Sequence, residues 1–209
     1  MSDTGYLGTM DLGDLSHPYN LDAFTILQHI GKMATVELVQ VIAVHGGGVN
    51  PTGTVDVQPM VNQIDGKGNP VAHGTIYNIP YFRIQGGTRA VINDPVVGDI
   101  GLCAFSSRDI SKVKNTLAIA NPGSRRRFDW ADGLYFGSFL GATPTSYIMM
   151  SSAGIKVVDP VKVEIDAPSC IVNGNVTLGG ASGGMGVARI GDAVSGGVIT
   201  GGSTVVKAL

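Results

Sequence analysis

The sequence predicts an all-β protein whose last third completes its fold only by winding around two further copies of itself. Three observations carry this prediction. Glycine makes up 31 of 209 residues, about twice its ordinary share, beside an ordinary hydrophobic fraction of 44%. Short segments rich in β-branched residues are separated by turn signals throughout. From Tyr147 onward, such segments recur at a spacing of about eight residues, which is typical of stacked β repeats.

Charge and length exclude several classes of protein. The formal net charge is −2 and no part of the chain forms a basic domain, so nucleic acid is not an expected partner. No apolar run approaches the roughly 18 residues that a membrane-spanning helix needs. The N-terminal residues show no charged segment followed by an apolar one, so we expect no secretory signal and expect synthesis in the cytoplasm. Cys103 and Cys170 lie in different regions, and we expect buried free thiols rather than a disulfide.

Residues 1–32 are expected to form an N-terminal arm. Asn20 is a candidate N-cap for a short helix with Leu21, Phe24 and Leu27 on one face. A short amphipathic helix of this kind packs on something larger. The sequence leaves two possibilities open, namely packing on its own domain and docking to a neighbouring protein.

Residues 33–145 are expected to form a barrel domain with a connecting segment. In the second strand, Val55 and Val57 are expected to point inward, and Asp65-Gly66 marks a hairpin turn. Pro80 interrupts the third strand, as at a sheet edge or a bulge. Five short strands closed by turns predict a small Greek-key barrel of the OB type, with a β-sandwich as the alternative. The predicted strands span residues 34–44, 53–61, 75–84, 89–94 and 100–107.

Arg125, Arg126 and Arg127 form the densest basic run of the chain. Phe128 and Trp130 follow, as in single-strand-binding surfaces, but nearby Asp129 and Asp132 partly neutralise the cluster. The interpretation favoured here is a solvated or interface loop.

Residues 146–186 are expected to form a shaft. Apolar and polar residues tend to alternate there, which indicates strands, but each strand is too short to be stable alone. Three intertwined chains with their apolar residues facing a common axis would explain both the alternation and the short strands. The prediction is therefore a homotrimeric triple-stranded β-helix, and a hairpin set in a sandwich is the alternative. The expected shaft core is Ile155, Val157, Val163, Ile165, Ile171, Val176 and Leu178.

Several phrases between Met33 and Gly141 resemble the N-terminal OB domain of baseplate central-spike proteins from contractile-tailed phages. They are GTVDVQPMV, NIPYF, DPVVGDIGLCAFSSRDI and RRRFDWADGLYFGSFLG, in that order. In that family a trimeric β-helix follows the OB domain and pierces the host outer membrane. The resemblance implies attachment to a tail-tube or hub protein through the arm and OB domain, transient contact with the outer membrane, and location at the tip of the virion's tail.

Residues 187–209 are similar to the repeat of PAAR tip proteins, which sharpen the spikes of phages and secretion systems. This chain carries one such unit, so three copies would supply the three units of a conical tip. The matching positions are Ala188, Arg189, Gly191, Asp192, Gly196, Gly197, Ile199, Gly201, Gly202, Ser203 and Val205.

The tip departs from that family where metal ligands would stand. Its metal-binding members use His and Cys, whereas His17, His29, His45 and His73 all lie far upstream here. We therefore expect no cofactor and no metal. A cation held by three copies of Asp192 is the less favoured possibility.

The sequence shows none of the common catalytic motifs considered, and we expect a structural protein rather than an enzyme. The expected function is that of a central spike which pierces the host outer membrane on sheath contraction. The alternative is an OB-fold binding module for nucleic acid or sugar with an oligomerising β tail. A cell-surface adhesin fragment is a third possibility, which the lack of a signal peptide disfavours.

Overall fold

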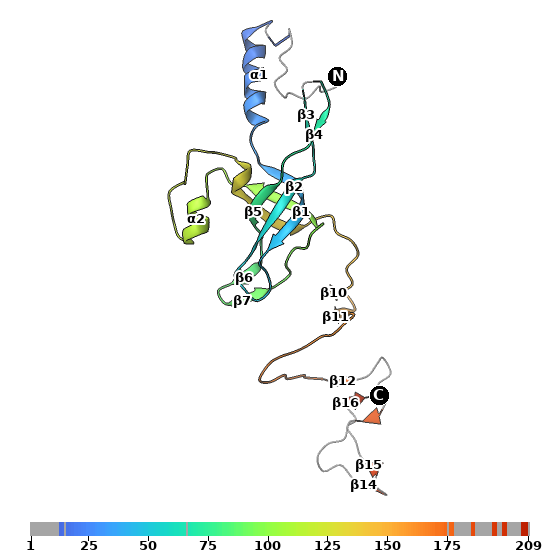
Figure 1. Ribbon diagram of the computed structural model, residues 1–209. Coiled ribbons are helices and arrows are strands. Elements are labelled where there is room, and N and C mark those ends of the chain that lie inside the picture. The colour runs from blue at the N-terminus through green and yellow to red at the C-terminus, as the bar shows by residue number, and fades with distance from the viewer. Residues whose placement is uncertain are drawn as a thin grey trace. The chain divides into compact units, whose positions relative to one another are not determined.

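A computed structural model describes residues 13–14, 16–65 and 67–174, together with the backbone of five short strands beyond residue 175 (Figure 1). The chain divides into two units, Met1–Thr143 and Pro144–Leu209. Each unit is described by itself below.

The first unit is built on a five-stranded antiparallel sheet with the strand order β5-β2-β1-β8-β9. Alternating apolar residues set the register; Val41, for example, lies opposite Val57. Irregularities between Val41 and Ala43, and again between Val55 and Val57, bend the sheet. Its strands are β1 (Val36–His45), β2 (Thr54–Pro59), β5 (Ile76–Pro80), β8 (Ile100–Phe105) and β9 (Gly133–Ser138).

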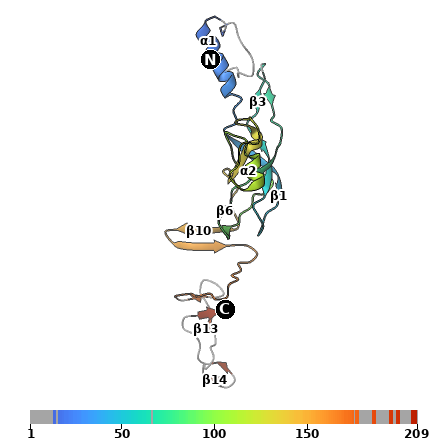
Figure 2. The same ribbon diagram turned by 90° about the vertical axis from the view of Figure 1, so that its left-hand side faces the viewer.

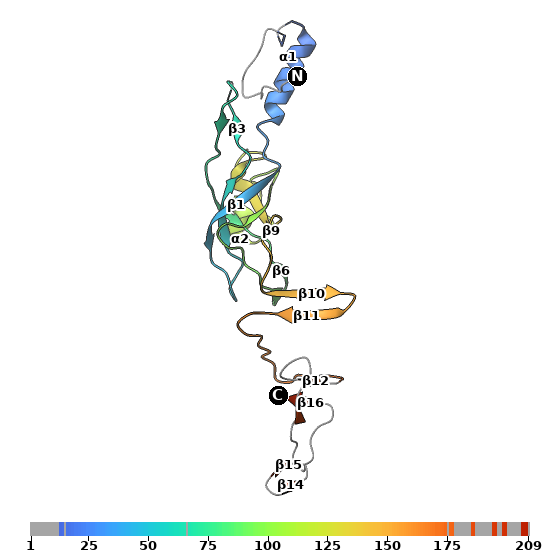
Figure 3. The ribbon, with the colours of Figure 1, turned by 90° about the vertical axis from the view of Figure 1, so that its right-hand side faces the viewer.

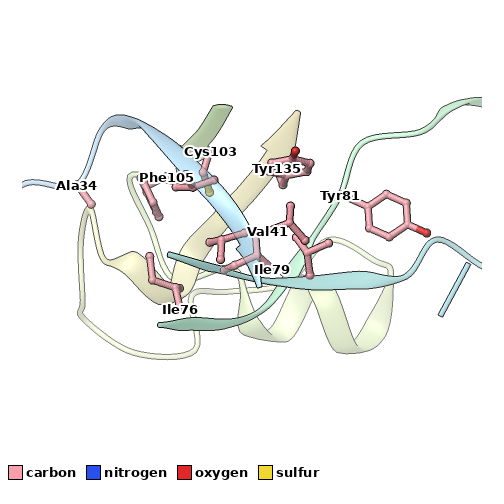
Figure 4. Packing of buried hydrophobic residues seen from close by; sticks show 11 residues of the cluster. Ala34, Val41, Ile76, Ile79, Tyr81, Cys103, Phe105 and Tyr135 are labelled. Atoms are coloured by element: carbon pink, nitrogen blue, oxygen red, sulfur yellow. The ribbon is translucent and has the colours of Figure 1, made fainter. Parts of the chain in front are cut away.

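The concave side of this sheet holds the hydrophobic core (Figure 4). Val55 and Val57 are fully buried, as predicted. Tyr135 from β9 and Cys103 from β8 are buried beside them, together with Ile79 from β5. β1, β2 and β8 therefore give alternate residues to one cluster, which is the arrangement that period-two alternation predicts.

The two edges of the sheet meet at one point. Tyr81, just after β5, forms a parallel bridge with Tyr135 of β9, and the Phe82 amide donates a hydrogen bond to the Tyr135 carbonyl at 2.7 Å. The sheet is thus curled into a half-barrel. A mostly β structure with a five-stranded antiparallel sheet is thus confirmed, while the Greek-key barrel of the OB type stays a prediction.

Two of the strand predictions need correction. The segment predicted at residues 89–94 forms only β7 (Arg89–Val91), which pairs with β6 (Ile84–Gly86) in a separate ribbon rather than joining the sheet. The fifth strand of the sheet is β9, which the sequence did not reveal because Gly133 and Gly137 interrupt its apolar pattern. A further ribbon joins β3 (Gln63–Ile64) to β4 (Pro70–Val71), with Asp65 accepting the Asn69 amide at 2.8 Å.

Two helices accompany the sheet. Helix α1 (Pro18–Ile30) begins after His17, whose Nδ1 accepts the Tyr19 amide at 3.1 Å. The predicted cap at Asn20 is therefore wrong: Pro18 at the first helical position starts the helix earlier. Helix α2 (Ser111–Thr116) and the short 3-10 helix η1 (Trp130–Asp132) lie in the long connection between β8 and β9. Figures 1 and 2 show α1 extending away from the sheet.

The second unit begins with a hairpin of β10 (Tyr147–Ser151) and β11 (Gly154–Val158), seen side-on in Figure 3. Residues 159–174 form no strand. Beyond them, β12 (Val176–Thr177) and β13 (Met185–Gly186) pair with β16 (Val206–Ala208), and β14 (Val194–Ser195) pairs with β15 (Val198–Ile199). The described residues of the single chain show no triple-stranded β-helix, and the strands predicted around Val163, Ile165 and Ile171 do not form in it, because segments this short have no pairing partner there.

Candidate functional site

Residues 144–174, here called the stem segment, expose many apolar side chains in the single chain. Of the predicted shaft core, Ile155, Ile165 and Ile171 are 71%, 74% and 80% exposed in the single chain. Val157 and Val163 are also exposed. Burying a side chain of this size releases roughly 1.5–3 kcal/mol, so a surface of this kind favours covering by a partner.

One face of the β10–β11 hairpin carries four exposed apolar residues. Ile148 lies opposite Val157, and Met150 lies opposite Ile155; because facing residues of an antiparallel pair share a face, all four point the same way. All four are more than half exposed. The other face carries Lys156 opposite Met149. The predicted shaft core did not include Ile148 and Met150, although they stand at alternate positions.

After the hairpin, residues 159–174 run without a strand partner in the single chain. Asp159 fixes the start of this run, since its carboxylate accepts the amides of Val161 at 2.8 Å and Lys162 at 3.1 Å. A hydrogen bond from the Ser146 hydroxyl lowers the pKa of Asp159, and these amides lower it further. Lys162 forms an ion pair with Glu164. Asp159, Lys162 and Glu164 thus have polar partners, whereas the large apolar side chains of this run are exposed.

The remaining predicted residues lie outside the described side chains. For Val176 and Ile199 only the backbone is described, in β12 and β15. The shaft residue Leu178 and the other tip positions are not among the described residues; these are Ala188, Arg189, Gly191, Asp192, Gly196, Gly197, Gly201, Gly202, Ser203 and Val205.

The central arginine of the basic run has a structural role. Arg126 Nε donates to Asp132 Oδ2 at 2.7 Å, and Arg126 Nη2 reaches Asp109 at 2.9 Å. Asp132 is completely buried, and its Oδ1 also accepts the Ile110 amide at 3.0 Å. This network ties the two ends of the β8–β9 connection together. The sequence identified the charges but not their burial, because burial depends on residues distant in the chain.

Hydrogen bonding and charge hold both carboxylates ionised. Bonds from the Ser111 hydroxyl and amide lower the pKa of Asp109 to about 2, and the Arg126 charge adds to this. The Arg126 guanidinium is the main cause of the lowered pKa of Asp132, while burial opposes it. The carboxylates in turn raise the pKa of Arg126. The network therefore stays charged at all ordinary pH values.

A second network lies at the seam of the sheet. Arg83 Nη2 donates to Asp94 at 2.7 Å, and the Tyr81 hydroxyl donates to the same oxygen at 2.7 Å. The Gly48 amide is the main cause of a pKa of about 2 for Asp94, with Arg83 and Tyr81 contributing. Arg83 Nη1 also binds the Asn50 carbonyl at 2.8 Å. These bonds fix the β1–β2 loop to the β5 end of the sheet and leave no nucleophile free.

The histidines and thiols form no reactive centre within the described residues. His45 Nε2 pairs with Asp56 at 2.9 Å, and the His73 ring packs on Trp130 with centroids 4.8 Å apart. No cluster of three or more His, Cys, Asp or Glu side chains suited to a metal occurs in the part of the chain that the structure describes. Both cysteines are free, but only Cys103 is buried; the expected burial of Cys170 is wrong in the single chain.

An aromatic patch lies on the outer side of the seam. Phe82 and Phe136 stack with ring centroids 6.1 Å apart, and both are about half exposed. Pro80 and Leu134 complete the wall of an apolar pocket of about 320 Å³ beside them. Such a surface can hold a planar or apolar group.

Comparisons with known proteins give no family for this chain. No protein-family model matches it, and no curated protein is significantly similar. Among the described residues, no helix is both long and apolar enough to cross a membrane.

Proposed function

We propose that this chain is the subunit of a homotrimeric central spike in the baseplate of a contractile-tailed phage or phage-like particle. The observation that carries the proposal is the stem segment, whose alternating apolar residues remain exposed in a single chain. Three copies that wind these residues around a common axis would bury them together. The resemblance of residues 33–141 to the OB domain of such spikes supports the same assignment.

The proposed mechanism is mechanical. The arm and the five-stranded domain attach the trimer to a tail-tube or hub protein, and the shaft transmits axial force to a conical tip when the sheath contracts. Intertwined strands resist shear because many backbone hydrogen bonds must break at the same time. The spike would cross the host outer membrane without catalysing a reaction, and it would reside at the tail tip of a particle assembled in the host cytoplasm.

The mass of the full chain in solution tests the proposal. Light scattering after size exclusion should give three times the chain mass of 21.6 kDa. Ile155→Asp should abolish trimers, because three carboxylates would meet on the axis without partners. Ile165→Asp should act in the same way.

Lys156→Asp is the matched control, since Lys156 neighbours Ile155 but lies on the opposite face of the hairpin. This variant should remain trimeric. A monomeric wild-type chain would overturn the proposal, and a trimeric Ile155→Asp variant would show that the hairpin face is assigned incorrectly.

The aromatic patch favours a second candidate function. Phe82 and Phe136 could stack on a base or a sugar ring, as aromatic side chains do in OB-type binding modules. A nucleic-acid ligand predicts oligonucleotide binding that weakens steeply with salt and is lost in Phe136→Ser. Absence of oligonucleotide and oligosaccharide binding by the wild-type chain would remove this candidate.

A further inference from the structure

Helix α1 exposes a stripe of apolar side chains. It has 13 residues and none of them is buried. An isolated helix of fewer than about 12–15 residues is only marginally stable in water, so packing on a partner normally holds it. Tyr19, Ile26 and Ile30 follow one another at spacings of seven and four residues, which places them on one stripe. This stripe is exposed, with Tyr19 at 74% and both isoleucines at 57%.

A second unpartnered surface lies on the β8–β9 connection, residues 106–132, here called the basic excursion. Leu117 and Ile119 protrude from it almost without contacts, being 89% and 106% exposed. Leu117 adopts φ +50° at the end of α2, a left-handed conformation that costs a leucine about 1 kcal/mol or more. The fold thus holds an apolar side chain outward in an unfavourable backbone conformation.

Basic side chains surround these apolar residues. Arg108, Arg125 and Arg127 form no ion pair among the described residues and border a pocket of about 620 Å³. The buried bonds of Arg126 to Asp109 and Asp132 hold this part of the excursion in place. An apolar centre with a charged margin is the usual make-up of a protein interface.

The charges of the two surfaces are complementary. Residues 1–31 contain four Asp and no Lys or Arg, whereas the excursion contains six Lys and Arg and three Asp. Asp22 lies on α1 itself, and Lys112 lies on α2. Both surfaces therefore expose apolar side chains, and their charges are of opposite sign.

The two surfaces of one chain do not cover each other. The Ala34 amide donates to the Phe128 carbonyl at 3.0 Å, which fixes the chain just after α1 against the base of the excursion. From that point α1 leads away, and Figures 1 and 2 show it apart from α2. The helix of a different copy can approach the excursion without breaking this anchor.

We propose that α1 of one copy docks on the basic excursion of the next copy, with Tyr19, Ile26 and Ile30 covering Leu117 and Ile119. Such a head-to-tail contact uses two different surfaces and closes into a ring at three copies. The proposal rests on the proposed trimer and adds a specific partner for the arm. It would lock the five-stranded domains of the spike to one another.

Engineered disulfides test this contact in the full chain. The background carries Cys170→Ser, since Cys170 is exposed and Cys103 is buried. In this background, Ile26→Cys combined with Leu117→Cys should give covalent dimers and trimers on a non-reducing gel under mild oxidation. Either substitution alone should leave monomers on the gel, because the contact joins two different surfaces.

Charge reversal supplies an independent readout. Asp22→Lys should reduce the cross-linked fraction about fivefold, which corresponds to roughly 1 kcal/mol for an exposed pair. Adding Lys112→Glu should restore the yield. Lys67→Glu, on the β3–β4 ribbon, is the control that should restore nothing.

The results separate this contact from the proposed function. A chain that is trimeric by light scattering but gives no covalent dimers or trimers overturns the contact and leaves the spike intact. An internal disulfide within monomers would mean that α1 covers its own excursion, and it would also overturn the contact. A chain that is monomeric by light scattering overturns both proposals.

Discussion

Arg126 shows how three identical residues in sequence can have different roles. Arg125 and Arg127 are exposed, whereas Arg126 turns inward and neutralises Asp109 and Asp132. Successive side chains in this segment point to opposite sides, and this alternation decides which of the three arginines points toward the five-stranded domain. The run as a whole was predictable as a loop, but the inward arginine was not, because its partners come from the start and the end of the excursion.

Replacing Arg126 by alanine should destabilise the five-stranded domain by about 2–4 kcal/mol, because Asp132 would remain buried and charged without its partner. Urea unfolding followed by Trp130 fluorescence measures this, since that residue is the only tryptophan of the chain. Arg125→Ala is the matched control and should change the free energy of unfolding by less than about 0.5 kcal/mol. Equal effects of the two variants would contradict the network.

At the scale of elements, strands with clear alternation were predictable and strands interrupted by glycine were not. β1, β2, β5 and β8 fall within predicted segments, and the inward positions of β2 are confirmed. β9 escaped prediction because Gly133 and Gly137 replace apolar residues. Packing explains Gly133: a Cβ there would lie 2.9 Å from Cys103 Sγ and 3.1 Å from Phe105, so the core itself requires glycine.

Gly101 leaves less room for a Cβ atom than Gly133 does. A Cβ would lie 2.1 Å from the Gly137 carbonyl oxygen and 2.4 Å from the Tyr135 hydroxyl, so β8 and β9 would have to separate. Gly101→Ala should lower the free energy of unfolding by about 3 kcal/mol or more. Thermal denaturation followed by circular dichroism measures the loss. Gly74→Ala, where a Cβ meets nothing within 4 Å, should leave the melting temperature near that of the wild type.

At the scale of the whole molecule, the two units differ in what stabilises them. The first unit has its own hydrophobic core and two ion-pair networks, and all of these are formed within a single chain. The stem segment has no core of its own among the described residues, and the proposed trimer supplies one. The free energy of unfolding of the first unit therefore depends mainly on contacts within one chain. The stability of the stem segment depends on the association of chains.

Acid should destabilise the first unit through its carboxylates. Asp94 and Asp109 have pKa values of about 2 in the folded chain, against an ordinary value of 3.8. Between these values the unfolded chain binds more protons, so the free energy of unfolding falls as the pH falls from about 4 toward 2. Above about pH 5 these groups contribute their full stabilisation.

Melting temperatures measured by circular dichroism at pH 7, 5 and 2.5 check this dependence. As far as these carboxylates are concerned, the melting temperatures at pH 7 and pH 5 should agree, and the melting temperature at pH 2.5 should be lower. Asp94→Asn should lower stability at pH 7 and reduce the drop at pH 2.5, since one titrating group is removed. A melting temperature that is the same at pH 5 and pH 2.5 would show that the networks do not stabilise the fold.

The sequence by itself determined the β class, most strands of the sheet, the inward face of β2 and the apolar alternation of the stem, because these depend on neighbours within a few residues. Tertiary structure alone decided which arginine binds the buried Asp109 and Asp132, where β7 and β9 pair, and that Ile148 and Met150 share a face with Ile155 and Val157. The physical reason is that burial and strand pairing are set by residues far apart in the chain.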